Sequence, residues 1–159
     1  GTVAMTGLNA GEYVRFKVAR QLGVDRIINI EKEDPVETVL TMTKGRGADM
    51  IIEASGAVPA ILQTVDMVRT CGRICAVGLS SKETVNFAWN KAMYKALDVK
   101  FNFSSSYTAW DRALALIAAT GNDLKSLITH KTSIDNWETV FNDLEAEKGV
   151  KAIFIPENN

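Results

Sequence analysis

Three short apolar runs alternate with two helical patterns over residues 26–78. The runs lie at residues 27–30, 50–53 and 73–77 and consist mainly of isoleucine, valine and other apolar residues. Short strands separated by amphipathic helices are typical of a parallel sheet with both faces covered. We therefore predict an α/β fold with a doubly wound parallel sheet, which would hold ligands at the carboxyl ends of its strands.

The rest of the sequence extends this pattern toward both ends of the chain. On the helix of residues 107–119, Leu114, Ile117 and Ala118 have the spacing of a buried face, and Asp135 is predicted to cap the last helix. No linker, repeat or low-complexity segment is found, so we expect one domain over residues 1–159. The expected strands are 3–6, 27–30, 50–54, 73–77, 85–88, 99–103, 127–131 and 152–155, and the expected helices are 13–22, 35–43, 60–69, 107–119 and one after residue 135.

Composition excludes several functional classes. The 159 residues are 47% hydrophobic, enough to form a core, and carry 18 basic against 19 acidic side chains. That balance gives no basic face for nucleic acid or an anionic membrane. No apolar run reaches the roughly 20 residues of a spanning helix, and no signal-peptide pattern opens the chain. We expect a soluble, cytoplasmic protein.

Reactive and metal-binding side chains are sparse. Cys71 and Cys75 flank and enter one predicted strand, so both are expected to be buried small hydrophobic residues. A disulfide is not expected, because cysteines four apart on one strand are too distant from each other. His130 is the only histidine, and its neighbours offer neither a catalytic triad nor the spacing of a zinc site. We predict a structural role for His130, no catalytic residue and no metal ligand.

Several spaced runs resemble a known enzyme family. They are LGVDRIIN at residues 22–29, GRGADMIIEASG at 45–56, GRICAVGL at 72–79, LITHK at 127–131 and GVKAIFIP at 149–156. In order and spacing they are similar to the coenzyme domain of the zinc-containing medium-chain alcohol and polyol dehydrogenases, which include sorbitol and threonine dehydrogenases. The resemblance implies a Rossmann-like fold in an NAD(P)-dependent oxidoreductase, with hydride moving between an alcohol or polyol carbon and nicotinamide.

Two parts of the family pattern have no counterpart in the sequence. The catalytic domain with its Cys, His and Glu zinc ligands is one, and the first strand with its glycine-rich turn is the other. Gly7, Asn9 and Gly11 do not have the spacing G-x-G-x-x-G, and the resemblance sets residues 3–6 on the second strand. We therefore expect a partial dinucleotide-binding domain, a fragment without activity or zinc of its own. The alternative keeps residues 7–11 as a working phosphate loop.

The resemblance implies cofactor contacts at the ends of the middle strands. Ser55 and Gly56 would line the ribose near the nicotinamide, with a helix cap as the alternative role of Ser55. Val77, Gly78 and Leu79 would form the wall against which the nicotinamide ring packs. A purely structural role would not require a glycine at position 78, whereas glycines here would let the cofactor pass close to the backbone.

Other implied contacts concern the remaining parts of the cofactor. Gly7 stands where the family has an acid that bonds the adenosine ribose, so NAD and NADP both stay open, unless the glycine serves only a turn. Arg15 and Lys17 could approach a 2′-phosphate. Alternatively, they are only charged residues on the solvent-exposed face of a helix. Phe103 would hold the carboxamide through its backbone or else be a core aromatic. Lys151 would neutralise the pyrophosphate or else be a solvated lysine.

Three hypotheses for function follow. The first is the cofactor-binding part of an alcohol or polyol dehydrogenase, the second a nucleotide-binding module without catalysis, and the third a dimerisation module. Residues 85–88, from Val85 to Ala88, resemble the family's edge strand, which pairs with its mate across a two-fold axis, so a homodimer is expected. The sequence does not name the alcohol, because the other domain would build most of the substrate pocket.

Overall fold

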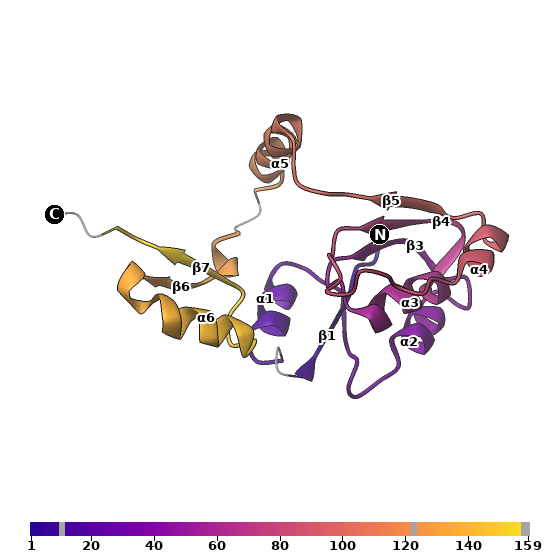
Figure 1. Ribbon diagram of the computed structural model, residues 1–159, viewed down its shortest axis with the longest axis horizontal. Coiled ribbons are helices and arrows are strands. Elements are labelled where there is room, and N and C mark those ends of the chain that lie inside the picture. The colour runs from indigo at the N-terminus through magenta and orange to yellow at the C-terminus, as the bar shows by residue number, and fades with distance from the viewer. Residues whose placement is uncertain (10–11, 122–123, 157–159) are drawn as a thin grey trace. The chain divides into compact units, whose positions relative to one another are not determined.

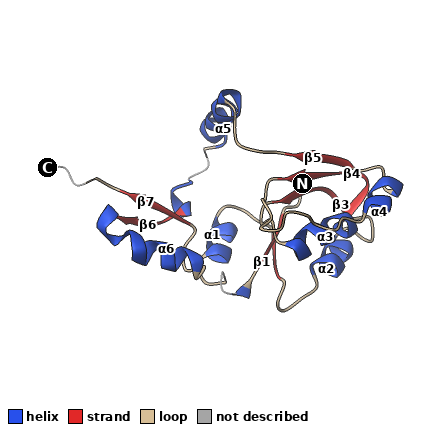
Figure 2. Ribbon diagram, in the orientation of Figure 1, coloured by secondary structure: helices blue, strands red, loops and turns tan. Residues whose placement is uncertain are grey.

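The computed structural model describes residues 1–9, 12–121 and 124–156, which form helices and parallel strands (Figures 1 and 2). Their contacts divide the chain into a central unit, Asp34–Tyr107, and a terminal unit that combines Gly1–Glu33 with Thr108–Asn159. The strands are β1 (Ala4–Gly7), β2 (Arg26–Asn29), β3 (Ala48–Glu53), β4 (Val68–Ala76), β5 (Asp98–Phe101), β6 (Ile128–Thr132) and β7 (Lys151–Phe154). The α-helices are α1 (Arg15–Gln21), α2 (Pro35–Met42), α3 (Val58–Met67), α4 (Trp89–Tyr94), α5 (Tyr107–Thr120) and α6 (Trp137–Glu145).

A three-stranded parallel sheet with the order β3-β4-β5 forms the central unit. Val65 and Val68 are fully buried and join Ile74 and Ala92 in its core. The register places Ile51, Ile74 and Val99 side by side, and these residues face that core. The apolar runs that predicted these strands are therefore confirmed, because they supply the residues that the helices cover.

The opposite face of this sheet is less covered than the sequence suggested. On β3, Met50 is 52% exposed and Ile52 is 62% exposed. Residues 50–54 were expected to form a strand buried on both faces, and that expectation is wrong for the described residues. Successive side chains of a strand point to opposite faces, so β3 packs against this core through Ile51 and presents Met50 and Ile52 to solvent.

The terminal unit contains two separate two-stranded parallel sheets. β1 pairs with β2, and β6 pairs with β7. Phe16 and Val18 of α1 are buried, as is Ile28 of β2. The 3₁₀ turns η2 (Leu124–Leu127) and η3 (Ile134–Asn136) flank β6, and α6 buries Val140. Within the described residues, β1 and β3 each pair with one neighbour, so each keeps one unpaired side.

Local signals explain where α2 begins. The Asp34 side chain accepts a hydrogen bond of 2.8 Å from the Glu37 amide, and Pro35 occupies the first helical position, so α2 begins at residue 35 as predicted. The last helix differs from its prediction, because Ser133 caps the turn η3 and α6 then begins at Trp137 after Asn136. Asp135 lies inside that turn, where its amide donates to the Ser133 hydroxyl, and it does not cap α6.

Two other expectations are wrong for the described residues. Residues 85–88 form no strand; Phe87 instead packs, half-buried, against the core of the central unit, and its carbonyl accepts from the Trp89 amide at 2.7 Å. Helix α5 forms at the predicted residues but buries no side chain, so Leu114, Ile117 and Ala118 do not face inward. Their spacing shows an apolar stripe, and no described element covers it.

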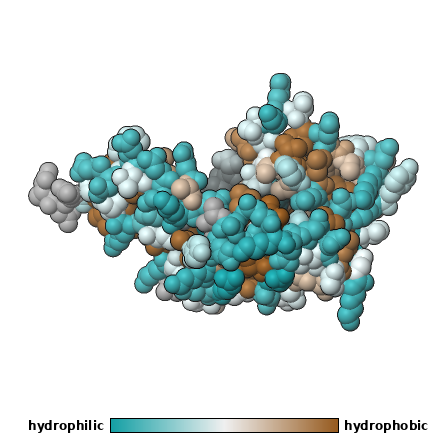
Figure 3. Space-filling view, turned by 90° about the horizontal axis from the view of Figure 1, so that it is seen from below, coloured by the Kyte–Doolittle hydropathy of each residue, from teal (hydrophilic) through white to brown (hydrophobic). Residues whose placement is uncertain are grey.

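Large hydrophobic side chains reach the surface, where brown residues lie among teal ones in the space-filling view (Figure 3). Trp89, Trp110 and Trp137 all belong to this exposed group, although the Trp137 ring meets Phe141 edge-on with 6.0 Å between the ring centroids. None of the described helices is both long enough and apolar enough to cross a membrane.

Candidate functional site

The carboxyl ends of β3 and β4 lie side by side in the central unit. Beyond the last residue of β4, the amides of Val77 and Gly78 donate to the Glu53 carbonyl at 2.8 and 2.9 Å. These bonds bring the loop after β3 next to the loop after β4. We call the residues that follow β3, β4 and β5 in this sheet the carboxyl edge, which includes Ser55, Gly56, Val77, Gly78, Leu79 and Phe103.

Backbone contact between the two loops accounts for both glycines of the carboxyl edge. Gly56 has φ +69°, and a Cβ on it would lie 2.2 Å from the Leu79 carbonyl oxygen. A Cβ on Gly78 would lie 2.2 Å from the Gly56 nitrogen. Such distances are incompatible with any side chain, so the prediction that packing would not require a glycine at position 78 is wrong. Protein atoms fill the space that each side chain would take.

The Glu53 carboxylate lies between these loops and is buried, with only 6% of the residue exposed. Its Oε1 accepts hydrogen bonds from the Ser55 amide at 3.0 Å, the Ser55 hydroxyl at 2.6 Å and the Gly56 amide at 3.1 Å. Oε2 accepts from the same Gly56 amide at 3.2 Å. The sequence analysis gave Glu53 no role, although a lone acid ending an apolar strand is a signal, because a buried carboxylate requires donors around it.

Ser55 takes part in this turn and does not cap α3. Its hydroxyl donates to Glu53 and accepts from the Ala57 amide at 3.1 Å, while Ala57 itself is the residue before the first turn of α3. The serine is exposed despite these bonds. The helix-cap alternative for Ser55 is therefore wrong, because Ala57 occupies the cap position and the Ser55 hydroxyl bonds within the turn before the helix.

Apolar side chains stand free on the carboxyl edge. Val77 is exposed, Leu79 is 82% exposed and Phe103 is 90% exposed. The core-aromatic alternative for Phe103 is thus wrong. The Asn102 amide still donates to the Ala76 carbonyl at 2.9 Å, which keeps the chain beside β4 up to Phe103. An exposed apolar wall beside two loops of small residues can receive a flat, uncharged ring.

Gly7 ends β1 in the terminal unit, and here too a side chain has no room. A Cβ on Gly7 would lie 2.5 Å from the Phe16 ring, which is almost fully buried. Two residues on, the Asn9 amide donates to the Glu31 carboxylate, and the Asn29 side chain donates to the Asn9 side-chain oxygen at 3.1 Å. The predicted loop of residues 7–11 cannot be followed throughout, because residues 10–11 lie outside the described residues.

The basic residues singled out in the terminal unit have different surroundings. The Arg15 guanidinium donates to the carbonyls of Leu144 and Gly149, each at 3.2 Å, and forms an ion pair with Glu147 at 3.3 Å. It is therefore held at the end of α6, which counts against a contact with a 2′-phosphate. Lys17 and Lys151 are exposed, and the Lys151 carbonyl accepts from the Thr129 hydroxyl at 3.2 Å.

His130 contacts two polar side chains, and its structural role stays a prediction. Its Nδ1 lies 3.1 Å from the Thr129 hydroxyl, and its Nε2 lies 3.6 Å from the Asp143 carboxylate. Among the described residues, no group of three or more His, Cys, Asp or Glu side chains could hold a metal ion. Both cysteines are free, but Cys71 is exposed, contrary to its prediction, because β4 leaves its regular register between Val68 and Arg73.

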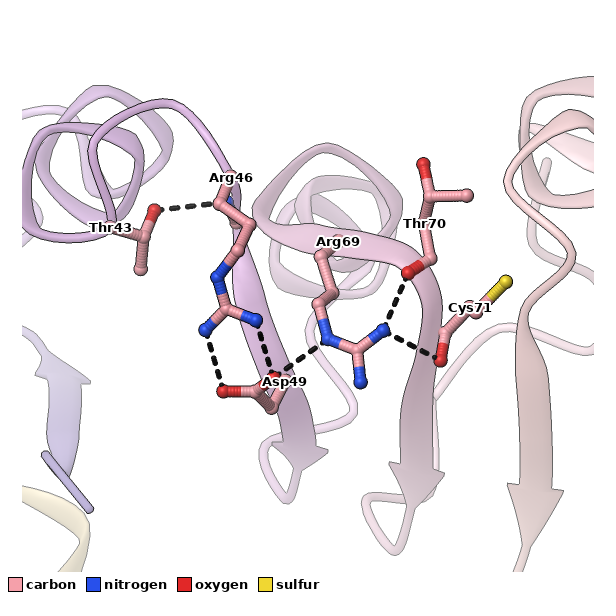
Figure 4. A network of polar contacts seen from close by, with 7 residues as sticks. Thr43, Arg46, Asp49, Arg69, Thr70 and Cys71 are labelled. Atoms are coloured by element: carbon pink, nitrogen blue, oxygen red, sulfur yellow. Dashed lines mark hydrogen bonds and ion pairs between the residues drawn. The ribbon is translucent and has the colours of Figure 1, made fainter.

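A network of charged side chains lies at the amino end of the same sheet (Figure 4). Arg46 donates to both oxygens of Asp49 at 2.7 and 2.8 Å, and Arg69 donates to Asp49 at 2.7 Å. These hydrogen bonds hold the pKa of Asp49 well below its usual range, and the pKa of Arg46 is raised by its bond to Asp49. Burial lowers the pKa of Lys95, whose ammonium donates to the Val65 and Val68 carbonyls.

Comparison with known proteins identifies the relatives of this chain. Residues 2–119 match the family described as zinc-binding dehydrogenase. The chain belongs to this family. Its zinc-binding dehydrogenase relatives include a sorbitol dehydrogenase from Halalkalibacterium halodurans, 33% identical over 156 residues, and an L-threonine 3-dehydrogenase from Bacillus subtilis, 30% identical over 157 residues. Each alignment covers 98% of this chain but only 45% of the relative, so the chain spans less than half of their length.

Solved structures of dehydrogenases share the fold. An alcohol dehydrogenase from Thermotoga maritima matches 99% of this chain and 44% of its own with a TM-score of 0.85 at 23% identity. A zinc-binding dehydrogenase from Sinorhizobium meliloti, whose structure has bound NADP, matches 97% of this chain and 43% of its own with a TM-score of 0.76 at 18% identity. The predicted Rossmann-like α/β class is thereby confirmed.

Proposed function

We propose that this chain holds the nicotinamide end of NAD or NADP for a dehydrogenase that oxidises an alcohol or polyol. In the whole protein, hydride would pass between the substrate carbon and the nicotinamide ring, while zinc held by another domain would polarise the substrate oxygen. The contribution of this chain is to bind and orient the cofactor. The observation that carries the proposal is the carboxyl edge, on which exposed apolar side chains stand beside two loops in backbone contact.

The carboxyl edge suits the nicotinamide end of the cofactor. Leu79 and Val77 offer an apolar wall for the ring, and the exposed Ser55 offers a polar group for the ribose. Parallel sheets bind ligands at this end of their strands, which agrees with the family. Gly56 and Gly78 contribute indirectly, because they allow the two loops to pack without side chains between them.

The phosphate end has less support among the described residues. Helix α1 follows β1, but its first turn has no side-chain cap, and the residue before it, Val14, is helical in conformation. A glycine-rich turn that leads directly from a strand into a helix would supply amides for the pyrophosphate. Lys151 offers a charge at the start of β7 in the terminal unit. We therefore infer weak binding of the dinucleotide by this chain alone.

Titration of isotopically labelled protein with NAD and with NADP tests the proposal. We expect weak binding, with amide shifts concentrated at residues 53–56 and 77–80, because the nicotinamide end has the better site. Leu79→Ser should reduce these shifts, whereas Leu116→Ser, at an exposed position of helix α5, should leave them unchanged. Shifts absent at millimolar cofactor would overturn the proposed function. Sub-micromolar binding would instead revive residues 7–11 as a phosphate loop.

The other implied partners remain proposals of this kind. We propose a homodimer through residues 85–88, although this segment is irregular within one chain and would have to become a strand against its mate. A dimerisation module without cofactor binding is the second function, favoured by the exposed aromatic residues of α4 and α5. Residues 1–159 are proposed as one partial dinucleotide-binding domain in a cytoplasmic enzyme.

A further inference from the structure

The buried carboxylate of Glu53, at the end of β3, lies beside the carboxyl edge and accepts hydrogen bonds from it. Three donors converge on it, namely the Ser55 amide, the Ser55 hydroxyl and the Gly56 amide. It also touches the neighbouring loop, because a Cβ on Gly78 would lie 2.6 Å from Oε2. Both oxygens of this carboxylate accept at least one hydrogen bond from the protein.

The reach of this side chain matters more than its charge. Two of the three donors are neutral backbone amides and the third is a hydroxyl, so none forms an ion pair with the carboxylate. An uncharged acceptor of the same length could accept most of these bonds at Oε1. A carboxylate one methylene shorter would either lose the bond to Gly56 or keep it only if the Ser55–Gly56 turn moved toward β3. Either change would alter the separation between this turn and Leu79.

We infer that Glu53 is a positioning residue, which sets the spacing of the loops after β3 and β4 and thereby the nicotinamide site. This inference rests on the proposed function. Glu53 would not touch the cofactor itself, because Ser55, Gly56 and Gly78 surround its carboxylate. It would act by holding the Ser55 hydroxyl and the Leu79 side chain at a fixed separation. Ser55 could then contact the ribose while Leu79 contacts the nicotinamide ring.

Two substitutions separate reach from charge. Glu53→Gln keeps the length and removes the charge, whereas Glu53→Asp keeps the charge and shortens the reach. We expect Glu53→Gln to bind NADH within about threefold of the wild-type chain and Glu53→Asp to bind roughly tenfold more weakly. Asp98→Asn is the matched control, because this acid lies on β5 of the same sheet and forms an exposed ion pair with Arg73 at 2.8 Å. Its NADH affinity should not change.

Two further readouts distinguish positioning from general stability. AMP lacks the nicotinamide end, so its affinity should stay within about threefold in all variants that are folded. Hydrogen exchange of the Gly56 amide, measured without ligand, should accelerate roughly tenfold in Glu53→Asp and change little in Glu53→Gln. Thermal unfolding of each variant shows whether a change in affinity merely follows a loss of the folded state.

The outcomes separate this inference from the proposed function. Equal NADH affinity of the two Glu53 variants, or weaker binding by Glu53→Gln than by Glu53→Asp, would overturn the inference and leave the proposed function standing. A wild-type chain that binds AMP but not NADH would overturn the proposed nicotinamide site, and the role of Glu53 would fall with it. A Gly56 amide that exchanges equally fast in both variants would refute the positioning contact directly.

Discussion

At the residue scale, packing within the protein explains residues that the sequence marked as ligand contacts. Gly7 and Gly78 are the clearest cases, because at each position the place of a Cβ is taken by other protein atoms. A glycine in a sequence shows only that a side chain is absent. Which atoms approach the backbone there depends on residues distant in the chain, such as Phe16 for Gly7 and the Gly56 amide for Gly78.

Gly7→Asp should destabilise the chain instead of simply restoring an acid that binds ribose. The new Cβ would lie 2.5 Å from the Phe16 ring, and the ring has little room to move because it is buried. Overpacking of this kind costs about 1–3 kcal/mol of unfolding free energy. Urea unfolding of Gly7→Ala, Phe16→Leu and the double variant measures the clash, because the smaller ring should relieve part of the cost.

The double variant provides the control. If the unfolding free energies of the two single variants add without a coupling term, position 7 does not meet the Phe16 ring and the packing explanation is wrong. If Gly7→Asp is as stable as the wild-type chain and binds NAD more tightly than NADP, the glycine serves only to omit the acid. Either result would show that Gly7 matters through the absence of an acid at the adenosine ribose, and so through the choice between NAD and NADP.

At the element scale, sequence reasoning located most helices and strands but not their coverage. The three apolar runs became β2, β3 and β4 because each supplies residues to a core. Helix α5 shows the limit, because Leu114 and Ile117 have core spacing and are nevertheless exposed. Periodicity shows which side of a helix is apolar, whereas burial depends on a partner surface, which local sequence does not specify.

The irregular start of β4 shows another limit. Ala48 pairs with Val68 but Met50 pairs with Arg73, so β4 bulges by several residues at this point. Arg69 lies in this bulge and reaches across to Asp49 on β3, while its guanidinium also donates to the carbonyls of Thr70 and Cys71 (Figure 4). No local signal in the sequence indicated this contact, because it joins residues twenty positions apart.

Asp49 should make the attachment of β3 to β4 sensitive to acid. Its pKa is depressed by hydrogen bonds from Arg46 and Arg69, so its stabilising effect is present above the ordinary carboxyl pKa of about 3.9 and is lost as the pH falls through the depressed value. Titration of the carboxyl carbon by NMR should give a pKa below the ordinary one. Asp49→Asn should lower stability near neutral pH and converge with the wild-type chain in strong acid.

Salt and a second acid serve as controls for this prediction. Because the network is exposed, added salt should reduce the difference between Asp49→Asn and the wild-type chain. Asp98→Asn, which removes a single exposed ion pair with Arg73, should have a smaller effect. An Asp49 carboxyl that titrates at its ordinary pKa would show that neither arginine holds it in solution.

At the scale of the whole molecule, β1 and β3 each keep one unpaired side among the described residues. A backbone edge without a partner needs water or another strand for its amides and carbonyls. Doubly wound sheets place their first strand centrally, and we predicted that this strand has no counterpart in the sequence. The described residues form a sheet β1-β2 and a sheet β3-β4-β5, and the absence of the first strand stays a prediction.

Zinc binding requires several ligand side chains close together in the chain's fold. Structural zinc is usually held by four protein ligands and catalytic zinc by three, but the described residues contain no suitable group of His, Cys, Asp and Glu side chains. His130, the only histidine of the sequence, lies beside Thr129 and Asp143. We therefore expect elemental analysis of the dialysed chain to find far less than one zinc per chain, and no oxidation of sorbitol or L-threonine with NAD or NADP.

A variant without thiols makes this test decisive, because the two free cysteines could bind zinc adventitiously. Any trace of zinc that disappears in the Cys71→Ser, Cys75→Ser double variant would come from these thiols and not from a built site. One tightly held zinc per chain that survives in that variant, or clear reduction of NAD by the wild-type chain, would contradict the prediction. Catalysis would then have to come from this chain, and its role could not be limited to orienting the cofactor.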